Sequence, residues 1–232
     1  MVEKKLSYHD VLLRSEDIDL LRGPHWLNDQ VIAFYFEYLT REKYRSAPDG
    51  PVFVNGATSF LLANSSAADV EETVAALQLA ERPLILFAVN NNPWVDVAEG
   101  GSHWSLLVSW KNRMCHCDSA GGTNRAAAQQ LALKLAPHLS AHGATPMLEA
   151  RTPQQVNGYD CGMHLLANAQ AVALHTSSPE STPSTPESTP CDGECGWGGI
   201  DREVEAAVAS VSAASVSKLR DEIYELILSL ME

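Results

Sequence analysis

One cysteine lies where a loop is expected to turn into a helix. Residues 155–163 read Gln-Val-Asn-Gly-Tyr-Asp-Cys-Gly-Met, and a helical pattern begins at Cys161. Unpaired N–H groups and the helix dipole at a helix N-terminus stabilise a thiolate. Gln155, upstream of the cysteine, carries an amide that can donate a hydrogen bond to an oxyanion. This arrangement is typical of the nucleophile and the oxyanion donor of a thiol protease.

A cysteine nucleophile also needs a general base and a group that orients the base. His103 opens an expected strand over residues 103–110, and Asp118 ends another expected strand over residues 113–118. A short turn at residues 111 and 112 would join these strands as a hairpin. We therefore expect His103 and Asp118 to lie together at one end of a sheet.

Each of these residues also has a simpler interpretation. A buried cysteine is often a small core hydrophobe, and an aspartate at a strand end is often a turn residue. His116 and His164 are alternative bases by sequence position, although His164 would point along the helix that follows Cys161. The residues alone leave these alternatives open, while placement favours His103.

Four motifs occur together along the chain. They are residues 24–29 (Pro-His-Trp-Leu-Asn-Asp), 101–105 (Gly-Ser-His-Trp-Ser), 117–119 (Cys-Asp-Ser) and 155–162 (Gln-Val-Asn-Gly-Tyr-Asp-Cys-Gly). In this order they resemble the sentrin-specific, or Ulp, cysteine proteases, which release ubiquitin-like modifiers. The resemblance covers nearly everything from Leu6 to Leu174.

The resemblance implies a role for each chemical residue. His103 would act as general base and then acid, Asp118 as its orienter, Cys161 as the nucleophile and Gln155 as the oxyanion donor. The chain order His, Asp, Cys is that of this family, and no cofactor is implied.

The resemblance also implies how a substrate tail is bound. Trp26 and Trp104 would roof a narrow tunnel that admits only a Gly-Gly tail, since glycine alone lets a backbone pass between indole faces without a clash. For Trp26 the alternative is a core position. Asp29 is expected to contact the backbone of the tail, and Asn91 to bind it from the loop over residues 90–101.

The opening residues 6–14 (Leu-Ser-Tyr-His-Asp-Val-Leu-Leu-Arg) and the compact length resemble the deneddylase branch, which acts on the Nedd/Rub modifier. A SUMO-specific protease is the alternative within enzymes. A non-catalytic module that binds a modifier is the alternative of another class, disfavoured because a pure binder needs no thiol. The expected partners are a Nedd/Rub-type modifier or SUMO and conjugates such as cullins, and the protein is expected to be monomeric.

Composition limits the other function classes. The chain has 232 residues and a formal net charge of -13, which argues against a nucleic-acid partner. No apolar run approaches the roughly 20 residues needed to span a bilayer, and the first residues have no apolar signal segment. We therefore expect no membrane partner and a location in the cytoplasm or nucleus.

The cysteines are expected to be reduced thiols, because their number is odd and no secretory signal precedes them. Cys115 and Cys117 form one close pair, and Cys191 and Cys195 form another. A zinc site across the pairs is conceivable, but neither has the usual spacing and His116 would point away from its neighbours on a strand. The expectation is that no metal is bound.

The pattern of elements predicts an α+β domain that resembles the papain-like cysteine proteinase fold, with a mixed or antiparallel central sheet flanked by helices. Expected strands cover residues 84–89, 103–110, 113–118 and 147–150, and expected helices cover 28–39, 66–77, 126–139 and 161–174. Residues 176–199 are rich in Ser, Thr, Pro and Gly and are expected to be a disordered insertion. Helical periodicity resumes over residues 201–229, so residues 1–232 are expected to form one domain.

Overall fold

The computed structural model describes residues 4–45, 49–94, 96, 100–111, 113–139, 146–177 and 200–231. The strands are β1 (Lys4–Tyr8), β2 (Val11–Arg14), β3 (Val52–Val54), β4 (Leu84–Asn90), β5 (Trp104–Trp110), β6 (Arg113–Cys117) and β7 (Leu148–Glu149). The helices are α1 (Ser15–Asp19), α2 (Asp29–Tyr38), α3 (Gly56–Asn64), α4 (Ala67–Ala76), α5 (Arg125–Leu139), α6 (Cys161–Ser177), α7 (Ile200–Val208) and α8 (Ala213–Met231). Short helical turns are η1 (Leu20–Arg22), η2 (Leu39–Lys43) and η3 (Leu79–Glu81).

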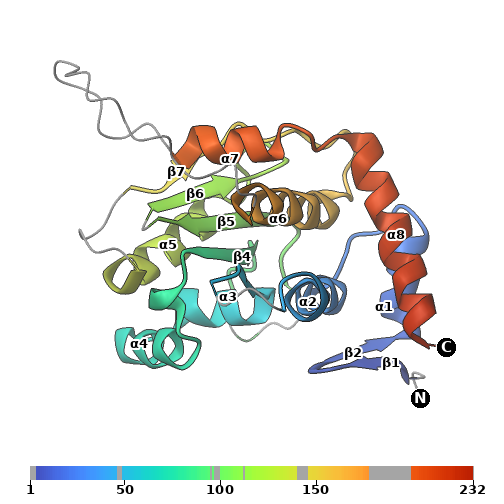
Figure 1. Ribbon diagram of the computed structural model, residues 1–232, viewed down its shortest axis with the longest axis horizontal. Coiled ribbons are helices and arrows are strands. Elements are labelled where there is room, and N and C mark those ends of the chain that lie inside the picture. The colour runs from blue at the N-terminus through green and yellow to red at the C-terminus, as the bar shows by residue number, and fades with distance from the viewer. Residues whose placement is uncertain are drawn as a thin grey trace.

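Within the described residues, five strands form one sheet in the order β3-β4-β5-β6-β7 (Figure 1). The central strands β4, β5 and β6 pair antiparallel, whereas β3 and β7 pair in parallel at the two edges. The sheet is therefore mixed, as the sequence predicts. A separate two-stranded ribbon of β1 and β2 lies beside α8 (Figure 1), and neither of its strands was expected.

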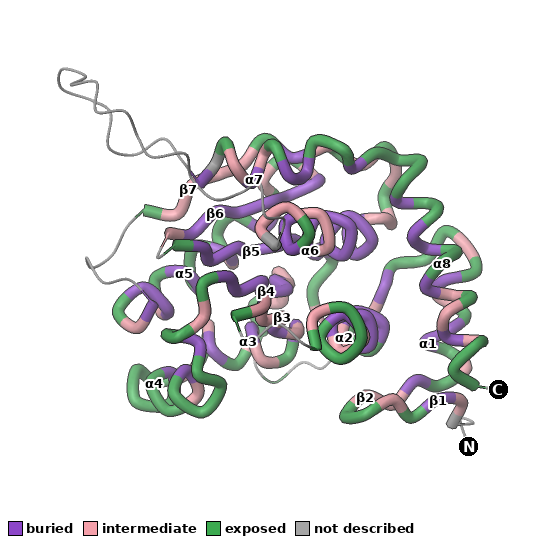
Figure 2. The backbone as a smooth tube through the Cα atoms, in the orientation of Figure 1, coloured by how far each residue is buried: buried purple, intermediate pink, exposed green. Residues whose placement is uncertain are grey.

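Helices cover both faces of the sheet and make two apolar cores. Alternate residues of β5 divide between them, with Leu106 and Val108 in the core that includes α2, α6 and α8, and Leu107 in the core that includes α5. Figure 2 shows the buried backbone concentrated in the central strands and α6. Since β5 is buried along its whole length, residues at its ends are held by packing on both sides.

The two strands that carry the predicted base and its orienter are each one residue shorter than expected. The backbone N–H of His103 donates to the side chain of Asn91, so β5 begins only at Trp104. The carboxylate of Asp118 accepts from the N–H of Ala120, which turns the chain, so β6 ends at Cys117. His103 and Asp118 therefore lie just outside the strands, and their side chains need not follow the alternation of faces along a strand.

The predicted helix starts are confirmed by their caps. Asn28 accepts from the N–H of Val31, and Ser66 forms a capping box with Asp69. Helix α6 extends past Leu174 to Ser177, so the first two residues of the expected insertion are helical. The rest of that insertion, residues 178–199, lies outside the described residues.

The expected helical stretch over residues 201–229 is two helices. Ser212 breaks it, because its hydroxyl accepts from the N–H of Ser215 and caps the start of α8. Along the described chain, no helix combines the length and the apolar character that crossing a membrane requires.

Arg220 of α8 joins three segments that are distant in the sequence. Its guanidinium donates to the carbonyls of Leu20 and His25 and to the carboxylate of Asp160, which is 2.7 Å away. Arg220 is 7% exposed, so these contacts are largely removed from water. The C-terminal helix thereby fixes the segment before Trp26 against the residue before Cys161.

We expect Arg220→Met to destabilise the fold by about 3 kcal/mol, because the change leaves Asp160 with no charge partner in a mostly buried place. Urea denaturation followed by circular dichroism measures the loss. Lys218→Met on the same helix is the matched control, since the Lys218–Glu222 pair is exposed and its removal should leave the midpoint unchanged. Equal midpoints for the two variants would contradict the role given to Arg220.

Candidate active site

The sheet end brings His103 and Asp118 into direct contact. His103 Nε2 lies 2.6 Å from Asp118 Oδ1, and both side chains are almost fully buried. Cys161 also interacts with the His103 side chain and contributes to the raised pKa of the imidazole. Because Nε2 is used by Asp118, Nδ1 is the ring nitrogen that remains for the thiol. The three residues predicted from sequence are thus adjacent in the order thiol, imidazole, carboxylate.

The surroundings favour the protonated form of His103. Burial by itself would lower the pKa of this imidazole. The hydrogen bonds and charges of Asp118 and Cys161 outweigh burial and raise the pKa to about 9. At neutral pH the site can therefore hold an imidazolium, the partner that a cysteine thiolate needs.

Asp118 is held in its ionised form. Burial would raise the pKa of the carboxyl, but His103 and the backbone N–H groups of Asn124 and Ala120 lower it on balance. The two N–H bonds are both 2.8 Å long. A carboxylate that accepts this many donors stays charged and fixes the imidazole ring.

The loop before β5 holds His103 from the backbone side. Asn91 Oδ1 accepts from the N–H groups of Ser102 and His103, at 2.7 and 3.1 Å. Gly101 has a φ of +90°, and a side chain there would run into the amide of Asn90. Asn91, expected to bind the substrate tail, therefore braces the loop in this structure.

Cys161 is the first residue of α6, as expected. The loop before it is shaped by Asn157, whose side chain accepts from the N–H groups of Tyr159 and Asp160. The next residue, Gly162, packs against Leu27, and an added Cβ would lie 3.0 Å from the Cβ of Leu27. This close approach brings the start of α6 against the segment that carries Trp26.

Gln155 lies beside the site with its amide oriented by neighbours. Ser119 Oγ donates to Gln155 Oε1 at 2.9 Å, and Gln155 Nε2 donates to the carbonyl of Asn157 at 2.6 Å. Since an amide nitrogen has two hydrogens, one remains for an oxyanion. Ser119 follows the orienting carboxylate in sequence and was not identified as a site residue from the pattern.

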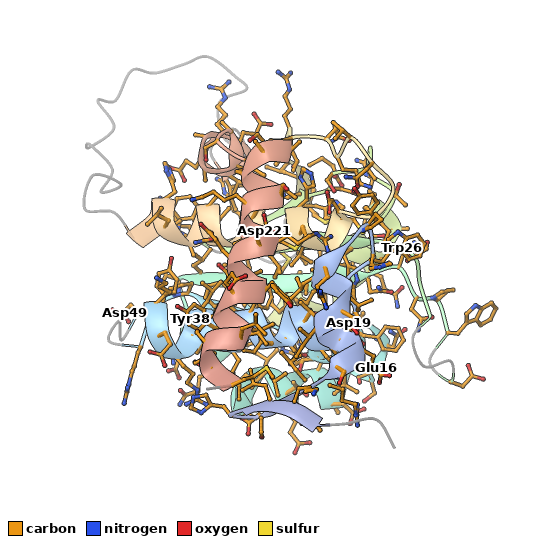
Figure 3. All side chains as sticks on the ribbon, turned by 90° about the vertical axis from the view of Figure 1, so that its right-hand side faces the viewer. Glu16, Asp19, Trp26, Tyr38, Asp49 and Asp221 are labelled. Atoms are coloured by element: carbon orange, nitrogen blue, oxygen red, sulfur yellow. The ribbon has the colours of Figure 1, made fainter. Side chains whose placement is uncertain are left out.

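A cleft of about 700 Å³ opens over the nucleophile, and its lining includes Cys161, His103, Trp26, Trp104 and Asp29. Trp104 is buried and its indole N–H donates to the carbonyl of Leu27 at 3.0 Å. Trp26 is 50% exposed, which excludes the alternative of a core position. Figure 3 shows Trp26 at the edge of the molecule, away from α8.

Trp26 is tied to the nucleophile loop. Its indole N–H donates to the carbonyl of Gly158 at 2.6 Å, across a separation of 132 residues. Trp26 and the loop before Cys161 are therefore joined by a direct hydrogen bond.

The alternative bases lie elsewhere. His116 is fully buried and hydrogen-bonds Glu149 and Ser105. His164 lies within α6, where burial lowers its pKa despite the nearby charge of Asp160. Placement in the fold therefore favours His103 as the partner of Cys161.

The cysteine pair of β6 is part of the core. Cys115 and Cys117 are buried and form no disulfide, they lie on the face that packs against α6, and burial raises the pKa of Cys117 to about 12. Among the described residues, no group of three potential ligands could hold a metal ion. Cys191 and Cys195 lie outside the described residues.

Asn124 contacts both His103 and Asp118 but was not identified as a site residue from the sequence. Its backbone N–H contacts Asp118, and its side chain donates to the carbonyl of His103 at 3.1 Å. Its spacing of six residues after Asp118 gave no signal of this role.

Comparisons with known proteins agree with this geometry. Residues 25–191 match the model of the Ulp1 protease family, C-terminal catalytic domain. The chain is 36% identical to NEDD8-specific protease 1 of Arabidopsis thaliana, over 99% of this chain and 94% of that protein. It is 38% identical to sentrin-specific protease 8 of Rattus norvegicus, over 76% of this chain and 83% of that protein.

The fold is also that of a solved member. The C-terminal Ulp1 protease domain, in complex with Smt3, the yeast ortholog of SUMO, superposes with a TM-score of 0.69 and 19% identity, over 100% of this chain and 90% of that one. The expected papain-like α+β fold is confirmed. With its thiol, imidazole and carboxylate in contact beneath a tryptophan-lined cleft, this chain belongs to the Ulp1 family of cysteine proteases.

Proposed function

We propose that this protease is a cysteine isopeptidase that cleaves after the C-terminal Gly-Gly of a NEDD8-type modifier. The observation that carries the proposal is the buried His103–Asp118 contact of 2.6 Å, with Cys161 acting on the same imidazole and raising its pKa. This arrangement can catalyse acyl transfer to the sulfur of Cys161. It also disfavours a pure binding module, which would need no buried ion pair beside a thiol.

The proposed reaction follows from the geometry. The Cys161 thiolate attacks the carbonyl carbon of the terminal glycine, and the oxyanion accepts from the backbone N–H of Cys161 and the free hydrogen of Gln155. Protonated His103 gives its proton to the leaving amine, the C–N bond breaks and a thioester remains. Neutral His103 then takes a proton from water as the water attacks the thioester. Hydrolysis restores the thiolate and releases the modifier with a free C-terminal carboxylate.

The cleft supports a narrow, glycine-only tail. Trp26 and Trp104 both line it, and each is fixed by an indole N–H bond to a backbone carbonyl. We propose that the gap between these indoles admits a backbone but not a side chain beside the thiol. Asp29 also lines the cleft, and we propose that it accepts an N–H of the tail.

The proposal that the modifier is of the NEDD8 type rests on the similarity of this chain to named proteases. Proteins named as NEDD8-specific protease and sentrin-specific protease 8 match most of this chain at 36% and 38% identity. The complex with a SUMO ortholog comes from a protein only 19% identical, which supports the fold and not the substrate. A SUMO-specific protease is therefore the less supported alternative.

The chemistry fits precursor processing and release from lysine side chains, including those of cullins. Acidic residues around the cleft, among them Glu16, Asp17 and Asp29, would attract a basic modifier surface. Figure 3 shows that Glu16, Asp19 and Asp221 lie on one face of the molecule. Action as a monomer in the cytoplasm or nucleus is part of the same proposal.

NEDD8 carrying a C-terminal propargylamide should label Cys161 covalently, because the electrophile lies where the scissile carbonyl would. Intact mass spectrometry and peptide mapping detect the adduct, and Cys161→Ala should give none while still binding NEDD8. SUMO and ubiquitin probes run in parallel set the selectivity. Absence of an adduct with all three probes would refute the enzymatic proposal, and an adduct with SUMO alone would correct the modifier.

Cleavage of a NEDD8 C-terminal fluorogenic amide should lose rate above about pH 9, because His103 then loses the proton that the leaving amine needs. Asp118→Asn removes the negative charge that raises the pKa of His103, so the basic limb of the kcat/KM profile should move to lower pH. The measurement is kcat/KM between pH 6 and 10. A basic limb at the same pH in both proteins would contradict the role of Asp118.

Replacing the penultimate glycine of the modifier tail by alanine should lower kcat/KM on the order of 100-fold, because a methyl group must clash with an indole. The control is the same replacement five residues before the terminus, outside the tryptophan pair, which should change kcat/KM much less. Equal losses at the two positions would be inconsistent with a tunnel.

A further inference from the structure

His116 is a buried polar residue that the proposed reaction does not use. It lies on β6 two residues before Asp118 and is 0% exposed. Its Nδ1 is 3.0 Å from Glu149 Oε2, and its Nε2 is 2.9 Å from Ser105 Oγ. A carboxylate only accepts, so Nδ1 carries a proton, and in the neutral imidazole Nε2 accepts from the Ser105 hydroxyl.

The hydrogen bonds continue from Ser105 to Asn124. Once the Ser105 hydroxyl donates to His116, its oxygen can accept from Asn124 Nδ2, which is 3.0 Å away. Asn124 is also fully buried, and Nδ2 lies 3.1 Å from the carbonyls of both Val89 and His103. Its backbone N–H donates to Asp118 Oδ2. Asn124 thus contacts both members of the His103–Asp118 pair.

This chain of polar groups lies within an apolar layer. Leu107, the residue paired with His116 across the sheet, and Met114 on the same strand belong to the core beneath α5. An apolar side chain at position 116 would avoid the desolvation cost of a polar one. The hydrogen bonds between these polar groups instead hold their side chains in one geometry, and Asn124 Oδ1 is the one buried oxygen of the network with no hydrogen-bond partner among the described residues.

The outer end of the chain is anchored by charge. Glu149 on the edge strand β7 is 28% exposed, and its Oε1 lies 3.5 Å from Arg125 Nε. Arg125 directly follows Asn124 at the start of α5. One carboxylate therefore holds both His116 and the helix turn that carries Asn124.

We propose that His116 and Asn124 are positioning residues, and that the hydrogen-bond chain Glu149–His116–Ser105–Asn124 holds His103 and Asp118 in the geometry that directs the imidazole to Cys161. The inference deepens the proposed function and rests on the roles given there to His103, Asp118 and Cys161. It concerns the face of the sheet opposite α6, so it places a determinant of the thiol's reactivity on the far side of the sheet from the cleft.

The test compares two substitutions at one position with a core control. His116→Phe keeps bulk but breaks the chain, whereas His116→Gln supplies an amide donor and acceptor. Met114→Leu changes packing on the same face of the same strand without touching the network. All three are measured in the full chain for kcat and KM with the fluorogenic NEDD8 amide, and for thermal stability.

We expect His116→Phe to lower kcat by about tenfold, because a small displacement of the general acid slows proton transfer, while KM changes less than about twofold. His116→Gln should recover most of the rate, and Met114→Leu should leave kcat unchanged. Ser105→Ala, a smaller change that removes only the hydroxyl, gives the same information if His116→Phe does not fold. Wild-type kcat in folded His116→Phe or Ser105→Ala, or an equal loss in Met114→Leu, would overturn the proposal.

A second readout does not depend on the modifier. Alkylation of Cys161 by iodoacetamide at pH 7, followed by mass spectrometry of the peptide that contains it, reports the imidazole–thiolate contact directly. The rate should fall in His116→Phe and recover in His116→Gln. If no modifier is cleaved by the wild-type protein, the proposed function fails while this comparison still decides the inference. An unchanged alkylation rate in His116→Phe would overturn it.

Discussion

The short hydrogen bond between His103 and Asp118 is the contact on which the rest of the site depends. Both side chains are buried, so removing either one would leave the other as an unpaired buried polar group and would cost folding free energy. The fold compensates the carboxylate with two backbone N–H donors and the imidazole with the thiol on its other side. The result is a proton held on His103 at neutral pH, next to a sulfur that reacts only as its anion.

The architecture explains how this contact meets the nucleophile. His103 and Asp118 come from the ends of adjacent strands, while Cys161 comes from a helix packed on one face of the sheet. The close packing of Gly162 on Leu27 and the ion pair of Arg220 with Asp160 set the start of that helix. The cleft is thus lined by segments within residues 14–30 and 90–104 and by Cys161, which lie far apart in the sequence and which the fold brings together.

Local sequence signals predicted much of this arrangement. The caps at Asn28 and Ser66, the apolar run of β4 and the hairpin of β5 and β6 all follow from short-range chemistry. The same signals led to His103, Asp118 and Cys161. Other features could not be predicted from local signals, also for physical reasons. The helix break at Ser212 lies within a stretch whose apolar residues keep a helical period, so the period hides the break. Strand β3 has only three residues, which are too few to show a periodic pattern.

Long-range side-chain contacts could not be predicted in the same way. Asn124 has the sequence signature of a helix cap, yet its amide turns to the sheet and bonds His103. Asn91, which is expected to meet substrate, also braces the backbone of His103, and that contact was not predicted. Arg220 bonds residues that are 60 or more positions away in the sequence, and the neighbouring residues of its helix do not indicate this role. Such roles depend on which elements the fold brings together.

The proposed mechanism requires that His103 is charged when the enzyme is at rest. ¹⁵N NMR of the histidine ring nitrogens, assigned with His103→Gln, measures this directly. We expect both ring nitrogens of His103 to stay protonated at pH 7.5 and the ring to titrate with a pKa of about 9. A neutral ring at pH 7.5, with a titration near the ordinary value of about 6.5, would contradict it.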